Sequence, residues 1–142
     1  MTVEQLVEYI KTSSLLEKDV LVMTGAGISL ASGIPTFRGK DDNAIWNNDV
    51  LEMATLAYFQ RDPVKAWSWH LKTFDKFNSI EFKPNVAHDA VVTLEKMWTG
   101  AFKLVTQNVD LLHERAGSDK LVKVHGSIDK IRCSRHGCKN GA

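Results

Sequence analysis

The sequence has few cysteines, few prolines, no excess of either charge and no long apolar run. Its 142 residues include two cysteines and three prolines, and the formal net charge is +1. Two cysteines allow one disulfide at most, which excludes the multi-bridge scaffold of a small secreted domain. A near-neutral charge gives no reason to expect nucleic acid or an anionic membrane as a partner. No apolar run approaches the roughly 18 residues of a membrane-spanning helix. We therefore expect one ordinary globular core.

The N-terminal stretch also lacks the basic, apolar character of a leader peptide. "MTVEQLVEYIKTSS" is acidic and amphipathic, and Thr2 with Gln5 fits a capping box. This predicts a first helix rather than a signal or transit peptide. The expected compartment is therefore cytoplasmic or nuclear, where cysteines are reduced or bind a metal.

Apolar segments that resemble strands alternate with segments that resemble helices. Short apolar runs predict buried parallel strands at 19–23, 101–106 and 120–125. Predicted helices run from Pro63 after its cap Asp62 to about 78, over 86–98 between the cap Asn85 and Gly100, and over 109–116 before Gly117. In the helix over 86–98 the expected inward residues are Ala87, Ala90, Val91, Leu94 and Met97. This alternation predicts an α/β fold with a parallel sheet.

A glycine-rich loop, "TGAGISLASGIPTFRG", follows the first predicted strand. Ligands of open α/β sheets lie beyond the carboxyl ends of the strands, and glycines there let backbone amides approach phosphate oxygens. Gly25 and Gly27 begin a G-x-G-x-x-G pattern, but Leu30 stands where the third glycine belongs. On this pattern alone, a nucleotide site and a plain strand-to-helix turn are equally supported.

The end of this loop favours the nucleotide. Phe37 and Arg38 offer an aromatic face and a fixed cation, and arginine matches a pyrophosphate through paired hydrogen bonds. The alternative is that Phe37 belongs to the core and Arg38 is a surface charge.

Polar residues also follow the second and third predicted strands. The amide and carboxylate groups of Gln107, Asn108 and Asp110 offer the donors and acceptors that a carboxamide and ribose hydroxyls need. The alternative for Asn108 is that it caps the next helix. His125 is a candidate proton acceptor, because histidine is the side chain suited to that role at neutral pH, although a lone histidine is more often structural.

Three segments resemble, in order, the signatures of the sirtuin family, the NAD-dependent protein deacylases. They are "GAGISLASGIPTFRG", "TQNVDLLHERAG" and "VHGS", and the resemblance spans about residues 20–133. It implies a Rossmann-like parallel sheet with helices on both faces, a helical insertion and the start of a small zinc module. The expected division is 1–40 with 85–127 for the Rossmann-like part, 41–84 for the insertion and 128–142 for the module.

The resemblance also implies residue roles. Asn108 and Asp110, with Ile34, would hold nicotinamide, and Gln107 would contact the nicotinamide ribose. His125 would be the general base, with Asn108 the second catalytic residue, whereas His113 is expected to be structural. The full set of implied NAD-binding residues is Gly25, Ala26, Gly27, Ser29, Ile34, Pro35, Phe37, Arg38, Gln107, Asn108, Asp110 and His125.

The implied reaction transfers an acyl group from a lysine of a protein or peptide to ADP-ribose and releases nicotinamide. Two alternatives remain at this point. The same fold can hydrolyse NAD or transfer a single ADP-ribose, and an inactive fragment can act as a binding module.

The end of the sequence departs from the family pattern. Sirtuin zinc modules have two cysteine pairs, whereas Cys133 and Cys138 form one pair with four residues between them, and His136 is an alternative ligand. Two thiolates do not complete a tetrahedral site, so we expect weak zinc binding or none. We also expect a truncated form that lacks the C-terminal part of the sheet.

One further departure concerns the acyl group. Sirtuins that prefer acidic acyl groups carry Tyr-x-x-Arg on the helix after the loop, and His70 and Thr73 stand at those positions here. The sequence therefore argues against acidic acyl groups as the main substrates. The protein substrate and the oligomeric state have no signature in the sequence.

Overall fold

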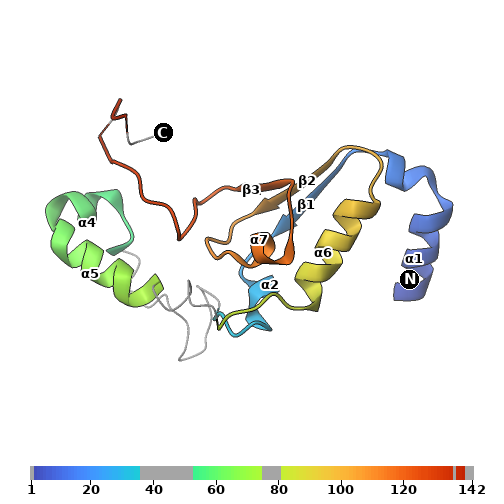
Figure 1. The fold of residues 1–142 in the computed structure, drawn as a ribbon, viewed down its shortest axis with the longest axis horizontal. Helices are drawn as coiled ribbons and strands as arrows, with labels where there is room; N and C mark the ends of the chain where they lie inside the picture. The colour runs from blue at the N-terminus through green and yellow to red at the C-terminus, as the bar shows by residue number, and fades with distance from the viewer. Residues whose placement is uncertain (1, 36–52, 75–80, 136, 140–142) are drawn as a thin grey trace.

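A computed structural model describes residues 2–35, 53–135 except 75–80, and 137–139. Its elements are α1 (Val3–Thr12), the 3-10 helix η1 (Ser14–Glu17), β1 (Val20–Thr24), α2 (Gly27–Leu30), α4 (Leu56–Arg61), α5 (Pro63–Phe74), α6 (Val86–Met97), β2 (Phe102–Thr106), α7 (Leu112–Ala116) and β3 (Leu121–Lys123) (Figure 1). In the described part of the chain, every helix is too short or too polar to cross a bilayer. Phe37 and Arg38 lie outside the described residues.

The three strands form one parallel sheet in the order β1-β2-β3. Val20 pairs with Phe102 at one end, and Thr24 pairs with Thr106 at the other. Thr106 in turn pairs with Lys123, the last residue of β3. The predicted parallel α/β sheet is therefore confirmed, with strand ends shifted by one or two residues.

Helices cover one face of this sheet. Val91 and Leu94 of α6 pack against a cluster on that face, which consists of Leu15, Leu16, Val20, Val22, Trp98, Phe102, Leu104 and Leu121. On α7, His113 contacts Thr24 of the same face. The opposite face is exposed at Leu21, Met23, Val122 and Val124. Helices were predicted on both faces of the sheet. Among the described residues, helices cover one face.

The predicted helix caps show where local sequence decides the fold. Thr2 and Gln5 form the expected capping box of α1. Asn85 caps α6 by accepting from the Ala87 amide at 2.9 Å, and Gly117 ends α7 with a φ of 97°. The predicted start of α7 was wrong, because the helix begins at Leu112 rather than 109.

The buried side of α6 differs from the expected one. Val91 and Leu94 are half-buried as predicted, but Ala87, Ala90 and Met97 are exposed. The fully buried residues are His88, Val92 and Glu95. The carboxylate of Glu95 accepts from the backbone amides of Asp119 and Lys120 at 3.1 and 2.9 Å. The side of α6 that carries His88, Val92 and Glu95 therefore faces inward. Its glutamate holds the backbone that enters β3.

Two helices, α4 and α5, lie in the range expected for a helical insertion. Figure 1 shows them apart from the sheet, on the side of the C-terminal segment. Thr55 caps α4, and Asp62 accepts from the Lys65 amide at 3.1 Å at the start of α5. The predicted continuation of α5 to about 78 falls outside the described residues.

Gly100 was predicted to end α6, and this was wrong. The helix ends at Met97, its C-cap is Trp98, and Trp98 has an extended backbone. A Cβ atom at Gly100 would lie 2.3 Å from the Lys18 carbonyl oxygen and 2.6 Å from that of Glu17. Glycine is needed here because two backbone segments pass too close for any side chain.

Replacing Gly100 by alanine should therefore lower the free energy of unfolding. The added methyl group forces the backbone at Glu17 and Lys18 to move, at a cost of roughly 1–3 kcal/mol. Gly27→Ala is the matched control, because a Cβ there meets nothing within 4 Å. Urea unfolding followed by circular dichroism measures both variants. Equal midpoints for G100A and the parent chain would contradict the close approach.

Two buried histidines join α6 to α7. The rings of His88 and His113 meet edge to face with centroids 4.9 Å apart. His113 Nε2 lies 2.9 Å from Thr24 Oγ1, and His88 Nδ1 accepts from the Asn85 amide at 3.3 Å. His88 Nε2 and His113 Nδ1 have no hydrogen-bond partner among the described residues. Protonation would put a proton on His88 Nδ1 against the Asn85 N–H, so the neutral form fits this packing.

Burial lowers the pKa of both histidines. The pKa of His88 is lowered by desolvation, which Asp110 and Asp89 oppose in part. The pKa of His113 is lowered by desolvation and by His88 and Lys123, whereas Asp110 and Glu114 raise it. The unfolded chain therefore binds these protons more readily than the folded chain does.

Stability should consequently fall as the pH drops below about 6.5, the value of an unperturbed histidine. Each histidine contributes at most about 1.4 kcal/mol per pH unit to the slope. The measurement is the free energy of unfolding between pH 7.5 and 5 for the parent and for the His88→Gln/His113→Gln variant, which keeps His70 and His125. The variant should show a shallower dependence, and an unchanged slope would refute the assignment.

Candidate functional site

The candidate site lies at one edge of the sheet, where the three strands end. Thr24, Thr106 and Lys123 are neighbours across the sheet, so the segments that follow them leave the same edge. These segments contain the glycine-rich loop, the Gln107–Asp110 cluster and His125. The register therefore brings together the three motifs that the sequence singled out, as expected for a parallel sheet.

Asn108 braces the glycine-rich loop. Its side chain is 3% exposed, and its Nδ2 donates to the Gly25 carbonyl and to Ser29 Oγ, both at 3.1 Å. The Asn108 amide donates to Thr106 Oγ1 at 3.1 Å. These contacts exclude the alternative that Asn108 caps α7. They fix the Asn108 side chain against Gly25 and Ser29 of the loop.

Asp110, not Asn108, bonds a backbone amide at the start of α7, where Leu111 occupies the N-cap position. One carboxylate oxygen accepts from the Leu112 amide at 3.0 Å, and the other accepts from Ser29 Oγ at 2.9 Å. Ser29 is 1% exposed and lies between the two side chains. Asn108, Ser29 and Asp110 thus form one buried chain of hydrogen bonds that ties the loop to the segment after β2.

A small apolar cluster supports the loop from the other side. Ile34 and Leu112 are buried against each other, and Phe82 and Ile128 pack on them. Asn85 adds a polar tie, because its Nδ2 donates to the Ile28 carbonyl at 2.8 Å and to Ser32 Oγ at 2.9 Å. The cap of α6 therefore also holds the loop. The sequence suggested only the capping role.

The remaining loop residues border open space. A Cβ atom at Gly25 or Gly27 would meet nothing within 4 Å. Ala26 and Pro35 are half-buried, and Gln107 is exposed beside the sheet edge. The backbone of this loop can therefore be approached closely by a ligand.

His125 is exposed in the turn after β3 and lines a pocket of ≈ 480 Å³. The pocket lies between α4–α5 and the segment that follows β3. Its other lining residues are Phe59, Trp67, His70, Leu71, Val109, Ser127, Ile128, Lys130, Ile131 and Arg132. The pocket is mainly apolar, and one imidazole group that can accept a proton faces it from the sheet edge.

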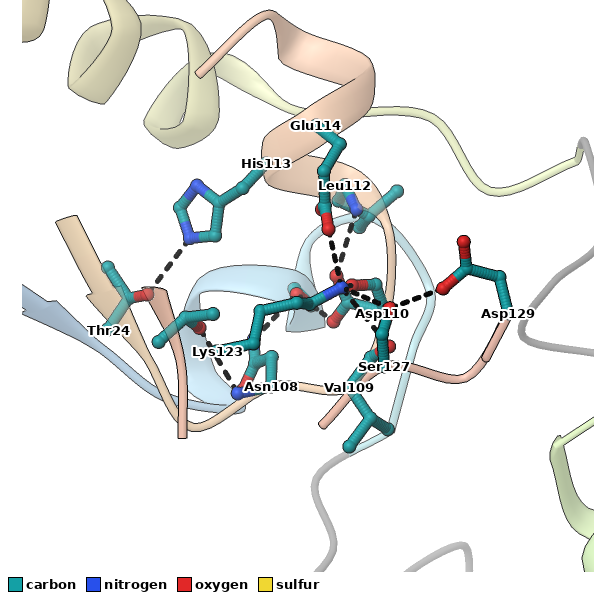
Figure 2. Close-up of polar contacts among 12 residues, drawn as sticks. Thr24, Asn108, Val109, Asp110, Leu112, His113, Glu114, Lys123, Ser127 and Asp129 are labelled. Carbon is teal, nitrogen blue, oxygen red and sulfur yellow. Dashed lines mark hydrogen bonds and ion pairs between the residues drawn. The ribbon is translucent and has the colours of Figure 1, made fainter. Parts of the chain in front are cut away.

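His113, which was expected to be structural, lies inside the molecule at 1% exposure. Figure 2 shows its ring directed at Thr24, away from the centre of the polar contacts. This buried position agrees with a structural role, because the hydrogen bond between His113 and Thr24 joins α7 to β1.

Sequence reasoning missed Lys123. Its ammonium group lies at the centre of Figure 2 and contacts Val109, Asp110, Glu114 and Ser127. The available signal was a lysine within an apolar strand, two residues before His125. A charged residue at a covered strand position requires partners, and these partners come from segments whose proximity only the fold reveals.

The cysteines lie in the segment that follows Arg132, the last residue in sequence that lines the pocket. Cys133 and Cys138 are half-buried free thiols. The pKa of Cys133 is lowered by the backbone N–H of Arg135 and by the side chain of Cys138. The described residues hold no group of three or more side chains suited to a metal. His136 lies outside the described residues.

Comparisons with known proteins agree with this geometry. The model of the Sir2 family matches residues 25–141. A Thermus thermophilus protein named NAD-dependent protein deacylase is 49% identical over 124 residues, which cover 84% of this chain and 47% of the relative. The chain spans about half the length of the curated relatives it matches.

Solved structures give the same result. A Sir2 homologue in complex with NAD has a TM-score of 0.73 at 40% identity, over 97% of this chain and 50% of the other. A Sir2 protein in complex with a deacetylated p53 peptide and 3'-O-acetyl ADP ribose has a TM-score of 0.74 at 28% identity, over 96% and 52%. The chain therefore belongs to the Sir2 family.

Proposed function

We propose that this chain carries the reaction centre of an NAD-dependent protein-lysine deacylase. The main support is that three features lie at one edge of the sheet. They are the buried hydrogen bonds that join Asn108, Ser29 and Asp110, the exposed His125, and the open glycine-rich loop. The reaction transfers the acyl group from lysine to ADP-ribose and releases nicotinamide. The Thermus relative's name and the NAD complex support this proposal.

The residues at the sheet edge fit NAD as co-substrate. NAD supplies a ribose carbon from which nicotinamide can leave. Asp110 accepts two hydrogen bonds within the protein, and a carboxylate can accept about four, so it retains capacity for a carboxamide N–H group. The open space beside Gly25 and Gly27 suits a close approach of phosphate oxygens.

The residues expected to hold NAD keep their proposed roles. Asn108, Asp110 and Ile34 orient the nicotinamide end, and Gln107 contacts its ribose. Because the first two side chains are already fixed by hydrogen bonds, binding requires little reordering. Preorganised polar groups of this kind stabilise a reaction without rearranging during it.

His125 accepts a proton from a ribose hydroxyl in this proposal. It stands at the wall of the pocket, and the apolar side chains of Phe59, Trp67 and Leu71 suit the aliphatic stem of an acyl-lysine. The peptide of the p53 complex supports a peptide substrate. His70 also lines the pocket, at the position where the acid-reading tyrosine of some sirtuins stands, so we propose uncharged acyl groups.

The proposed function includes a structural zinc ion bound by the two cysteines. The Arg135 backbone N–H and the Cys138 side chain lower the pKa of Cys133, which favours the thiolate that a metal ligand requires. Cys133 and Cys138 would supply two of the four ligands of a structural zinc. Two thiolates alone hold zinc weakly.

The test is nicotinamide release from NAD with and without an acetyl-lysine peptide. The 142-residue chain is compared with His125→Ala and with the surface control Lys96→Ala, all matched by circular dichroism. Loss of a general base lowers the rate by about 10²–10⁴-fold, so H125A should release little acyl-ADP-ribose while K96A equals the parent.

The products separate the proposal from its alternatives. Acyl-ADP-ribose formed only with peptide supports a deacylase. Free ADP-ribose formed without peptide identifies an NAD hydrolase instead. No acyl-ADP-ribose above the H125A background means that this chain does not perform the reaction by itself, and the proposal then fails for it.

A further inference from the structure

We propose that Lys123 is a positioning residue that holds the Asn108–Asp110 segment and the His125 turn in one arrangement. This inference rests on the proposed function, because it concerns the same site. Lys123 is the last residue of β3 and lies two residues before His125. Its side chain is only 12% exposed, so the ammonium group needs protein partners.

The ammonium group has these partners on three segments (Figure 2). It donates to the Asp110 carbonyl at 2.5 Å, to Glu114 Oε1 at 2.6 Å and to Ser127 Oγ at 3.0 Å. A fourth contact, to the Val109 carbonyl, is longer at 3.4 Å. An ammonium group has three N–H donors, so the three shorter contacts satisfy it completely.

The first partner links Lys123 to the nicotinamide side of the site. The Asp110 carbonyl belongs to the residue whose carboxylate holds Ser29 and the Leu112 amide. Fixing this carbonyl fixes the backbone from which the carboxylate extends. Glu114 adds a counter-charge from α7, one turn further along the chain.

The third partner links Lys123 to the base. Ser127 accepts from Lys123 and donates to Asp129. The hydrogen bond between Lys123 and Ser127 closes the turn that contains His125 and Gly126, where Gly126 has a φ of 81°. The Ile128 amide then donates to the Val109 carbonyl at 3.0 Å. The His125 turn is therefore anchored to the segment after β2 at two adjacent points.

Lysine suits this position better than arginine does. Its compact charge directs three donors at acceptors on different sides, whereas the planar guanidinium group is longer and directs its donors in one plane. A methionine fills similar space and removes every donor. Lys123→Met should thus loosen the connection between the two segments without emptying the core.

Hydrogen exchange of backbone amides tests this without requiring any activity. In the 142-residue chain, K123M should lower the protection of the Ile128 and Leu112 amides about tenfold or more, because both belong to the anchored segments. The Leu104 amide, which donates to the Lys120 carbonyl inside the sheet, is the internal reference. K123R should restore only part of the protection.

Two control variants separate the possible causes. Lys120→Met removes the lysine that directly precedes the same strand and should leave the Ile128 amide protected. Glu114→Gln removes the counter-charge but keeps the carbonyl contacts, so it should also preserve protection. If E114Q matches K123M, the ion pair alone is responsible. If K123M lowers protection equally at Leu104, the residue serves general stability, and either result overturns the positioning role.

The catalytic readout is kept separate. Where the parent chain forms acyl-ADP-ribose, K123M should lower kcat about tenfold or more, K123R should recover part of it, and K120M should match the parent. An unchanged kcat with a loosened Ile128 amide would overturn the link to the reaction. If the parent forms no product, the proposed function fails for this chain, while the exchange experiment still decides whether Lys123 anchors the two segments.

Discussion

The parallel register of three short strands is the constraint on which the site depends. Thr24, Thr106 and Lys123 end their strands side by side. Three loops that are distant in sequence consequently start within one or two strand spacings of each other. The polar contacts between these loops depend on the adjacent strand ends. Asn108 can reach Gly25, and Lys123 can reach Asp110, because the strands before them are neighbours. A slip of one residue would turn Thr106 and Lys123 toward the exposed face.

The packing that maintains this register is small and partly polar. Only one face of the sheet is covered among the described residues, and the covering helices are held by specific polar groups as well as by apolar contact. Glu95 holds the entry to β3, and the His88–His113 pair joins α6 to α7. Hydrogen bonds of this kind are directional, so they specify one arrangement more strictly than apolar contact does. The chain spans about half of its relatives, and the exposed Leu21 and Met23 lie on the face without described helices.

The sequence predicted what is local and missed what depends on neighbours in space. Apolar runs gave the strands, and Thr2, Asn85 and Gly117 gave helix ends, because capping involves residues two to four positions apart. Gly100 looked like a helix end, yet its reason is the backbone at Lys18, 82 positions away in sequence. The residue pattern alone favoured a capping role for Asn108, the family resemblance favoured a site, and its contacts with Gly25 and Ser29 exclude capping. The buried histidine and glutamate of α6 were missed because helical periodicity counts polar residues as exposed.

In the proposed function, the two halves of the candidate site have different tasks. Asn108 and Asp110 are buried, bonded on several sides and fixed before any ligand arrives, which suits recognition of a flat carboxamide. His125 is exposed in a glycine turn, which suits a group that must meet a substrate and pass on a proton. Such a division requires a connection, since a proton acceptor free to move relative to the bound ribose would seldom be in range. The contacts of Lys123 reach both halves, and its charge is compatible with burial because those partners are there. The lysine and the geometry of the site therefore depend on each other. Without this arrangement the ammonium group lacks its acceptors, and without the ammonium group the arrangement loses three of the hydrogen bonds that join its segments.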